Sequence, residues 1–160
     1  PLICTSTWIK DSRLLRASLP SETLSVMETC ESSGTTDSQK YLDAVDIFYK
    51  MHLCRIDPWP EPVLKTMNLI NSVCYEGMWG PNEFTCNGIL ENYDGSKDLS
   101  KIDAPTLVTC GDFDEATPTS TQYFSNMIPN SNFRSFKASS HMAFIEEEAD
   151  YLHLVENFLA

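Results

Sequence analysis

The sequence predicts an α/β fold in which a long helical segment precedes a short unit of alternating strands and helices. Three observations predict it. Residues 6–54 carry apolar side chains at helical spacing. Residues 104–110 form a short apolar run rich in β-branched side chains, as expected for a buried parallel strand. Beyond this run, helical and extended patterns alternate to the end of the chain, and a hydrophobic fraction of 42% is enough for a core.

Helix caps and helix-breaking residues predict the bounds of the first secondary-structure elements. Residues 1–5 are apolar and are expected to be the end of a core strand in a longer chain. The segment "TWIKDSRLLRAS" is expected to be a helix that ends before Pro20. Ser21 is a good N-cap for the next helix, which Gly34 terminates.

A third helix is predicted within residues 35–54, since its apolar side chains recur on one stripe. Residues 55–63 alternate proline with other residues, which indicates a stiff, extended connector. A short helix over 61–71 follows, and 73–100, with its glycines and prolines, is expected to be irregular. The stripe consists of Tyr41, Val45, Phe48, Tyr49 and His52.

The last 60 positions predict two strands, each followed by a loop and a helix. A helix is expected over 117–128, with Thr117 as cap and Pro118 in its first turn. The second strand falls within 129–137, and a loop leads from it into the final helix. The chain thus divides into the end of a core strand (1–5), a helical cap domain (6–100) and an α/β part (101–160).

Composition excludes several classes of function. A net charge of −12 argues against binding to nucleic acid or to an anionic membrane surface, and no apolar run is long enough to span a bilayer. The six cysteines form no C-x-x-C pair, so a metal site is not expected. Their wide spacing favours free thiols, with Cys54 and Cys110 buried, and hence a reducing, cytoplasmic location.

Polar side chains gather on the loops that follow the two predicted strands. The first loop, "CGDFDEATP", contains Asp112, Asp114 and Glu115, and the second, "SSHMAF", contains His141. In open α/β sheets, functional groups collect beyond the carboxyl ends of the strands. An acid after one strand and a histidine after the next is the second half of a Ser…Asp…His triad in the chain order of α/β-hydrolases.

Three motifs carry a more specific resemblance. The segments "PTLVTCGDFDEATP" and "SSHMAFIEE" resemble the C-terminal end of the proline iminopeptidase family of α/β-hydrolases, and "MWGPNEF" resembles its cap. The similarity runs through most of the chain, "RIDPWPEP" included, and is greatest to the branch of the tricorn-interacting aminopeptidase and amino-acid amidases. It implies the C-terminal portion of an α/β-hydrolase fold behind an all-helical cap.

The resemblance implies roles for individual residues. The family's catalytic acid matches Asp114 and its histidine matches His141, whereas Asp112 has no family role. Glu115 and Glu83 match carboxylates that hold the free α-amino group of the substrate, and Tyr75 is expected to lend its hydroxyl to the same pocket. The substrate is therefore a peptide or amino-acid amide with a free amino terminus, and no metal or cofactor is implied.

Blander interpretations stand beside these. A loop Asp is often merely solvated, His141 could be an ordinary loop histidine, and Glu83 could be an exposed acid beside a Gly-Pro turn. His52 and His153 are expected to be structural. Trp59, Trp79 and the aromatic residues near Phe84 are candidates for lining a substrate pocket, and cap packing is the alternative for Trp59.

The nucleophile is missing from the sequence. There is no G-x-S-x-G motif, and Ser139 and Ser140 lack the strand–turn–helix setting that such a serine needs. We therefore expect the chain alone to be inactive, and the N-terminal half of the same hydrolase to be its partner. Two alternatives remain: an amino-acid amidase or esterase on the same scaffold, and a non-catalytic α/β-hydrolase-like binding module.

Overall fold

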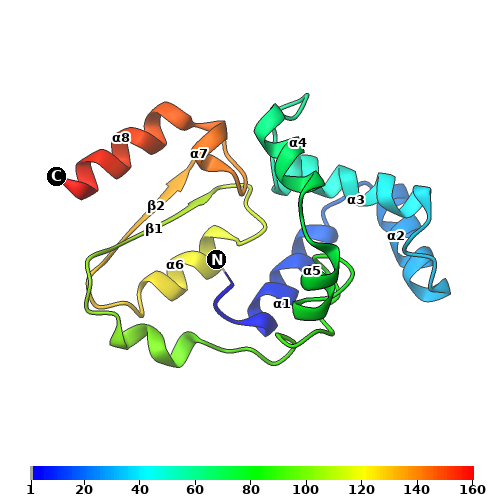
Figure 1. Ribbon diagram of the computed structural model, residues 1–160, viewed down its shortest axis with the longest axis horizontal. Coiled ribbons are helices and arrows are strands. Elements are labelled where there is room, and N and C mark those ends of the chain that lie inside the picture. Colours follow the sequence, from blue (N-terminus) through cyan, green and yellow to red (C-terminus); the bar gives the residue numbers. More distant parts are fainter. Residues whose placement is uncertain (1) are drawn as a thin grey trace.

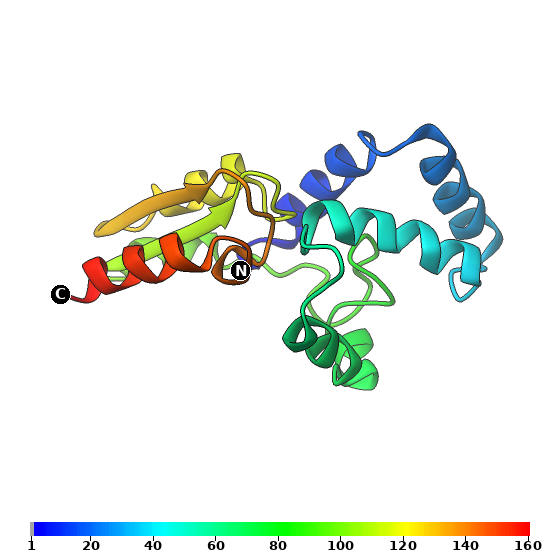
Figure 2. The same ribbon diagram turned by 90° about the horizontal axis from the view of Figure 1, so that it is seen from above.

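The computed structural model describes residues 2–160, which form two units lying side by side (Figure 1). The N-terminal unit is helical and the C-terminal unit contains a parallel strand pair flanked by helices (Figure 2). The helices of the first unit are α1 (Thr5–Arg16), α2 (Ser21–Ser33), α3 (Gln39–His52), α4 (Glu61–Asn68) and α5 (Ser72–Met78). The 3-10 helix η1 (Ser96–Lys101) leads into β1 (Thr106–Gly111), α6 (Pro118–Ser125), β2 (Ser131–Phe136), α7 (Ala143–Glu146) and α8 (Glu148–Leu159).

The core of the helical unit lies between α2 and α3. Gly34 ends α2 in the left-handed conformation, with φ of 67°, and so allows the chain to reverse into α3. The expected apolar stripe of α3 faces this core, and Phe48 is completely buried there. The buried cluster consists of Leu19, Met27, Cys30, Tyr41, Ala44, Val45 and Phe48.

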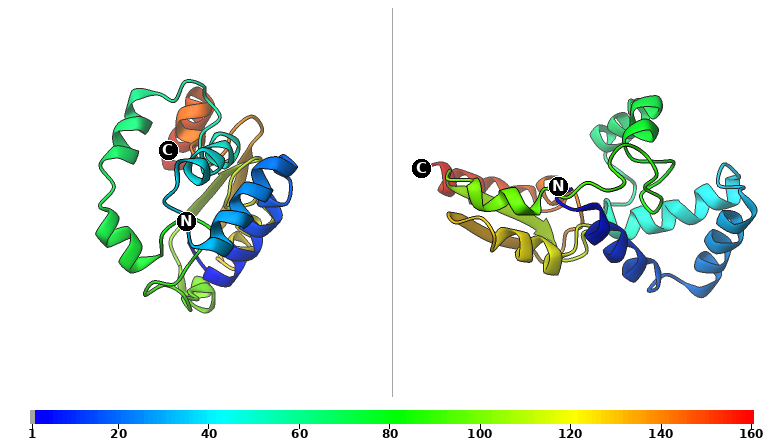
Figure 3. Two further views of the ribbon diagram at one scale, coloured as in Figure 1. Left: turned by 90° about the vertical axis from the view of Figure 1, so that its right-hand side faces the viewer. Right: turned by 90° about the horizontal axis from the view of Figure 1, so that it is seen from below.

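The two strands pair in parallel, as predicted, with Thr106 opposite Ser131 and Gly111 opposite Phe136. Helices α6 and α8 lie on opposite faces of this pair (Figure 2; Figure 3). Thr117 caps α6 through its side-chain oxygen, which accepts a hydrogen bond from the backbone N–H of Ser120. Parallel pairing brings the carboxyl ends of both strands, and the loops that follow them, to one edge.

Some local details differ from the sequence-based expectation. Of the strand end expected over 1–5, residue 1 lies outside the described part, Cys4 forms a single antiparallel bridge to Asp94, and α1 already begins at Thr5. The loop expected after β2 contains the short helix α7. Across residues 2–160, each helix is too short or too polar to cross a membrane.

Candidate active site

The loops after β1 and β2 are bound directly to each other. The backbone N–H of Asp112 donates to the carbonyl of Phe136 at 2.8 Å, and that of Phe113 donates to the carbonyl of Ser139 at 3.0 Å. Gly111 makes this approach possible, because a Cβ there would lie 2.1 Å from the Ser139 oxygen. The glycine of the G-x-x-D motif therefore brings the two loops together.

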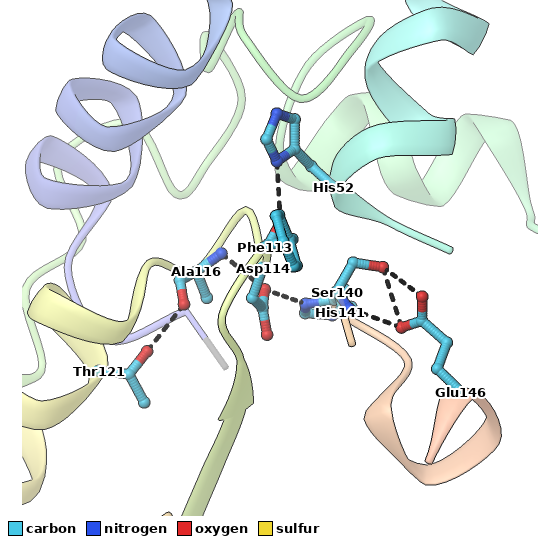
Figure 4. Close-up of polar contacts among 8 residues, drawn as sticks. All are labelled: His52, Phe113, Asp114, Ala116, Thr121, Ser140, His141 and Glu146. Carbon is cyan, nitrogen blue, oxygen red and sulfur yellow. Dashed lines mark hydrogen bonds and ion pairs between the residues drawn. The ribbon is translucent and has the colours of Figure 1, made fainter. Parts of the chain in front are cut away.

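Asp114 and His141 meet at this junction. The Nδ1 atom of His141 lies 2.8 Å from Oδ1 of Asp114, whose side chain is almost completely buried (Figure 4). The same carboxylate accepts a hydrogen bond from the backbone N–H of Ala116 at 2.7 Å. Burial alone would lower the pKa of His141, but the hydrogen bond and negative charge of Asp114 outweigh it and raise that pKa.

Two glutamates from the end of the second loop hold the segment before His141. Glu146 accepts hydrogen bonds from the backbone N–H and the hydroxyl of Ser140, at 2.8 and 2.9 Å (Figure 4). Glu147 accepts the hydroxyl of Ser139 and the N–H of Ala138. Both serines are completely buried, so these carboxylates satisfy groups that water cannot reach.

Glu83 and Tyr75 meet on the cap side of the site. The hydroxyl of Tyr75 donates to Oε1 of Glu83 at 2.5 Å. The turn that carries Glu83 is held by the buried Asn82, whose side chain donates to the hydroxyl of Tyr41 and accepts from the N–H of Phe84. Burial raises the pKa of Glu83. It likewise raises the pKa of Tyr75, and the charge of Glu83 adds to that shift.

Glu115 is as buried as its neighbour Asp114, with 4% of each residue exposed. Unlike Asp114, it has an oxygen, Oε2, that finds no hydrogen-bond partner among the described residues. Burial, followed by the charge of Glu83, raises the pKa of Glu115 to about 8. Within residues 2–160 neither Glu115 nor Glu83 forms an ion pair with a cationic side chain.

A cavity of about 340 Å³ joins Glu83 to His141. Its wall is mainly apolar, with a few polar groups, which is the usual composition of a small-molecule site. The indoles of Trp79 and Trp8 pack edge to face, with ring centroids 6.0 Å apart. The cavity is lined by Leu2, Trp8, Cys74, Tyr75, Met78, Trp79, Glu83, Leu90 and His141.

The structure separates the remaining candidates. Asp112 forms an ion pair with Lys137 at 3.0 Å. Trp79 lines the cavity, whereas the indole N–H of Trp59 donates to the carbonyl of Cys54, at the end of the α3 region. Cys54 and Cys110 are buried, and all six cysteines are free thiols.

Some residues near the site had no signal of their own in the sequence. The stripe of α3 marked Tyr49 and His52 as packing residues. The charges of Glu83 and Glu115 nevertheless help burial to raise the pKa of Tyr49, so this hydroxyl lies near both carboxylates. Asn82 and Glu146 act through backbone contacts that no spacing rule reveals. Within the described part of the chain, no group of three or more His, Cys, Asp and Glu side chains could hold a metal ion.

No protein-family model matches the chain. It is 39% identical to a proline iminopeptidase of Heyndrickxia coagulans, over 99% of this chain and 56% of that protein. The chain is homologous to the C-terminal part of the proline iminopeptidases. A solved proline iminopeptidase from Mycobacterium smegmatis superimposes with a TM-score of 0.88 at 33% identity, covering 97% of this chain and 52% of the other.

The solved structure of VinJ is also similar, with a TM-score of 0.93 at 32% identity, covering 98% of this chain and 53% of VinJ. These similarities show that the two units are parts of an α/β-hydrolase fold. The chain spans about half the length of the curated proline iminopeptidases it matches.

Proposed function

We propose that this chain is part of a serine aminopeptidase of the proline iminopeptidase type, which releases the N-terminal residue of a peptide through an acyl-enzyme. One observation carries the proposal: the buried Asp114 is hydrogen-bonded to His141, and His141 opens into a cavity that also contains Glu83. A carboxylate, an imidazole and an apolar pocket in this arrangement fit two thirds of a Ser-His-Asp triad beside a substrate site.

In this mechanism Asp114 accepts the N–H of Nδ1 and so keeps the imidazole of His141 in one tautomer. The other ring nitrogen is then free to take the proton of a serine hydroxyl as the serine attacks the scissile carbonyl. His141 next gives this proton to the leaving amine. A water molecule, deprotonated by the same imidazole, hydrolyses the acyl-enzyme and returns the serine.

Glu83 and Glu115 bind the free α-amino group of the substrate in this proposal, and Tyr75 supports Glu83. Burial raises the pKa of each carboxylate, and neither forms an ion pair with a cationic side chain among residues 2–160. An ammonium group would supply that cation and form charge-assisted hydrogen bonds with both. A substrate with a blocked amine would leave the acids unpaired, which makes the enzyme an exopeptidase.

The nucleophilic serine and the oxyanion hole come from a segment outside these residues, namely the N-terminal half of the same hydrolase. The chain matches only about half the length of the curated relatives, which supports this part of the proposal. We call the chain together with that segment the complete protein. The chain alone is expected to be inactive, because removing the nucleophile of a triad abolishes most of its rate enhancement.

The test is hydrolysis of aminoacyl anilides by the complete protein and by its His141→Ala variant. We expect activity in the first and a loss of about a thousandfold or more in the second. His153→Ala is the matched control, since His153 lies on the exposed side of α8. Full activity in the His141 variant would refute the proposal.

The choice of substrates separates the alternatives. A peptide substrate that is cleaved faster than a simple amide or ester favours the aminopeptidase over an amidase or esterase. Cleavage of N-acetylated substrates at the same rate as free amines would contradict the role of Glu83 and Glu115. Binding of amino-terminal ligands without any turnover would favour a non-catalytic binding module.

A further inference from the structure

One residue of the cap, His52, is bound to both loops of the candidate active site. Its Nδ1 atom lies 2.8 Å from the carbonyl oxygen of Phe113, the residue directly before Asp114 (Figure 4). Its own backbone carbonyl accepts a hydrogen bond from the N–H of His141, at 3.2 Å. His52 is the last residue of α3, so its carbonyl is one of those that a helix leaves without an internal partner.

The hydrogen-bond partner of the His52 ring shows which of its nitrogens carries the hydrogen. A carbonyl oxygen only accepts, so Nδ1 of His52 carries the hydrogen and donates it to Phe113. The residue is 5% exposed, and Nε2 has no hydrogen-bond partner within residues 2–160. Burial lowers the pKa of His52, which keeps the ring neutral at neutral pH.

The ring is also fixed from the cap side. It packs on Phe48, with centroids 4.7 Å apart, and Phe48 is completely buried in the core of α2 and α3. His52 therefore links the cap core to the two loops that it contacts.

The residues after His52 extend this junction. The guanidinium of Arg55 lies 3.7 Å from the centre of the Phe113 ring. The backbone N–H of Arg55 donates to Oε1 of Glu146 at 2.7 Å, and Glu146 also binds Ser140. His52 and Arg55 each contact Phe113, in the Asp114 loop. Each also binds the His141 loop, His52 through His141 and Arg55 through Glu146.

We propose that His52 is a positioning residue, through which the cap core sets the alignment of Asp114 with His141. This inference rests on the proposed function, because it assigns the pair a catalytic role. His52 is not among the residues that line the cavity between Glu83 and His141. It acts by holding the carbonyl next to Asp114 and the N–H of His141 at a fixed separation.

Two variants of the complete protein separate the hydrogen bond from the packing. His52→Phe keeps a ring against Phe48 but removes the donor to Phe113. His52→Asn gives up the ring but keeps an N–H near the place of Nδ1. His153→Phe serves as the control, because His153 is exposed on α8.

For each variant, we would measure kcat, KM and the pKa of the His141 imidazole by NMR. We expect His52→Phe to lower kcat about tenfold with KM unchanged, since small misalignments of catalytic groups are costly. We also expect the pKa of His141 to fall towards its ordinary value, and His52→Asn to restore both. Should His52→Phe fail to fold, His52→Gln replaces it, because its amide N–H sits nearer to the place of Nε2.

Two outcomes would overturn the inference. One is a donor-free variant with the kcat and the His141 pKa of the wild type. The other is an equal loss of kcat in His52→Phe and His52→Asn while the pKa of His141 stays unchanged. That result would show that His52 matters only through its packing against Phe48. If the wild-type complete protein shows no peptidase activity, the proposed function fails, yet the NMR titration still tests whether His52 aligns the pair.

Discussion

The two sides of the candidate site contain equally buried carboxylates that differ in their partners. On the side of the strand loops, Asp114 accepts hydrogen bonds from His141 and from the backbone of Ala116. On the side that faces the cap, Glu115 is just as buried, but its Oε2 has no partner among residues 2–160. Asp114 thus has its hydrogen-bond partners within the described residues, whereas Glu115 and Glu83 form no ion pair among them.

This difference distinguishes two uses of a buried charge. A carboxylate that orients a histidine must be held by the protein before the substrate arrives. A carboxylate that recognises an ammonium group must leave at least one acceptor position open to it, and the protein tolerates the cost of burying it. The predictions below alter one side at a time.

The largest effect is expected from Asp114→Asn. The amide would donate towards Nδ1 and favour the wrong tautomer of His141, so kcat should fall by about 10⁴. Steady-state kinetics on an aminoacyl anilide measures this. Asp112→Asn, two positions earlier, removes only the ion pair with Lys137 and should retain kcat within about twofold. Equal losses in both variants would show that the loop, and not the carboxylate, is responsible.

The next effect concerns substrate recognition. Glu115→Gln and Glu83→Gln should each lower kcat/KM for free-amine substrates by about a hundredfold, since each removes a charged partner of the ammonium. The same variants should leave N-acetylated substrates almost unaffected, so the ratio of the two rates is the measurement. Glu148→Gln, on the exposed side of α8, is the control. A parallel loss on both substrates would contradict an amino-group site.

Glu115 also predicts a pH-dependent stability. Its pKa of about 8 in the folded state lies above the ordinary 4.5, so the folded state keeps a proton that the unfolded state releases between these pH values. The free energy of unfolding should therefore fall as the pH rises from 4.5 to about 8.

Glu115→Gln mimics the protonated form and should remove this loss of stability. Urea unfolding at pH 5 and pH 8 would show the variant more stable than the wild type at pH 8, by on the order of 3 kcal/mol. At pH 5 the two should be similar. An identical pH dependence in both proteins would mean that Glu115 is ionised without penalty.

The smallest effect is expected from Tyr75→Phe. It removes the hydroxyl that donates to Glu83 but leaves both carboxylates in place. A hydrogen bond to a charged group contributes about 1.5–3 kcal/mol, part of which the substrate ammonium replaces, so KM should rise only several-fold. Tyr123→Phe, an exposed tyrosine on α6, should leave KM unchanged. A loss in kcat with KM constant would place Tyr75 closer to the chemistry than we propose.

Patterns along the chain were sufficient for several elements of the fold. The stripe of α3 predicted its buried face, Thr117 and Pro118 predicted the start of α6, and the apolar run over 104–110 predicted β1. Each signal involves residues within about one or two turns of each other, where geometry depends on local backbone conformation. The short helix α7 escaped this reasoning because four residues carry too little periodicity.

Motif order and strand topology were also sufficient for the pair Asp114 and His141, because parallel strands must bring their carboxyl ends to one edge. The residues that contact that pair could not be predicted in the same way. The role of His52 depends on where α3 ends relative to two loops that lie more than 60 and more than 80 positions away in the sequence. Its place on an apolar stripe predicted packing, and the structure adds two hydrogen bonds.

By itself, therefore, the sequence determined the helical and α/β units, the loops that carry Asp114 and His141, and the resemblance to proline iminopeptidases. Only the tertiary structure decided that Asp114 has hydrogen-bond partners while Oε2 of Glu115 has none among residues 2–160, and that the cap core reaches both loops through His52. The physical reason is that burial and hydrogen-bond satisfaction depend on neighbours from distant segments, whereas caps, turns and periodicity depend on neighbours along the chain.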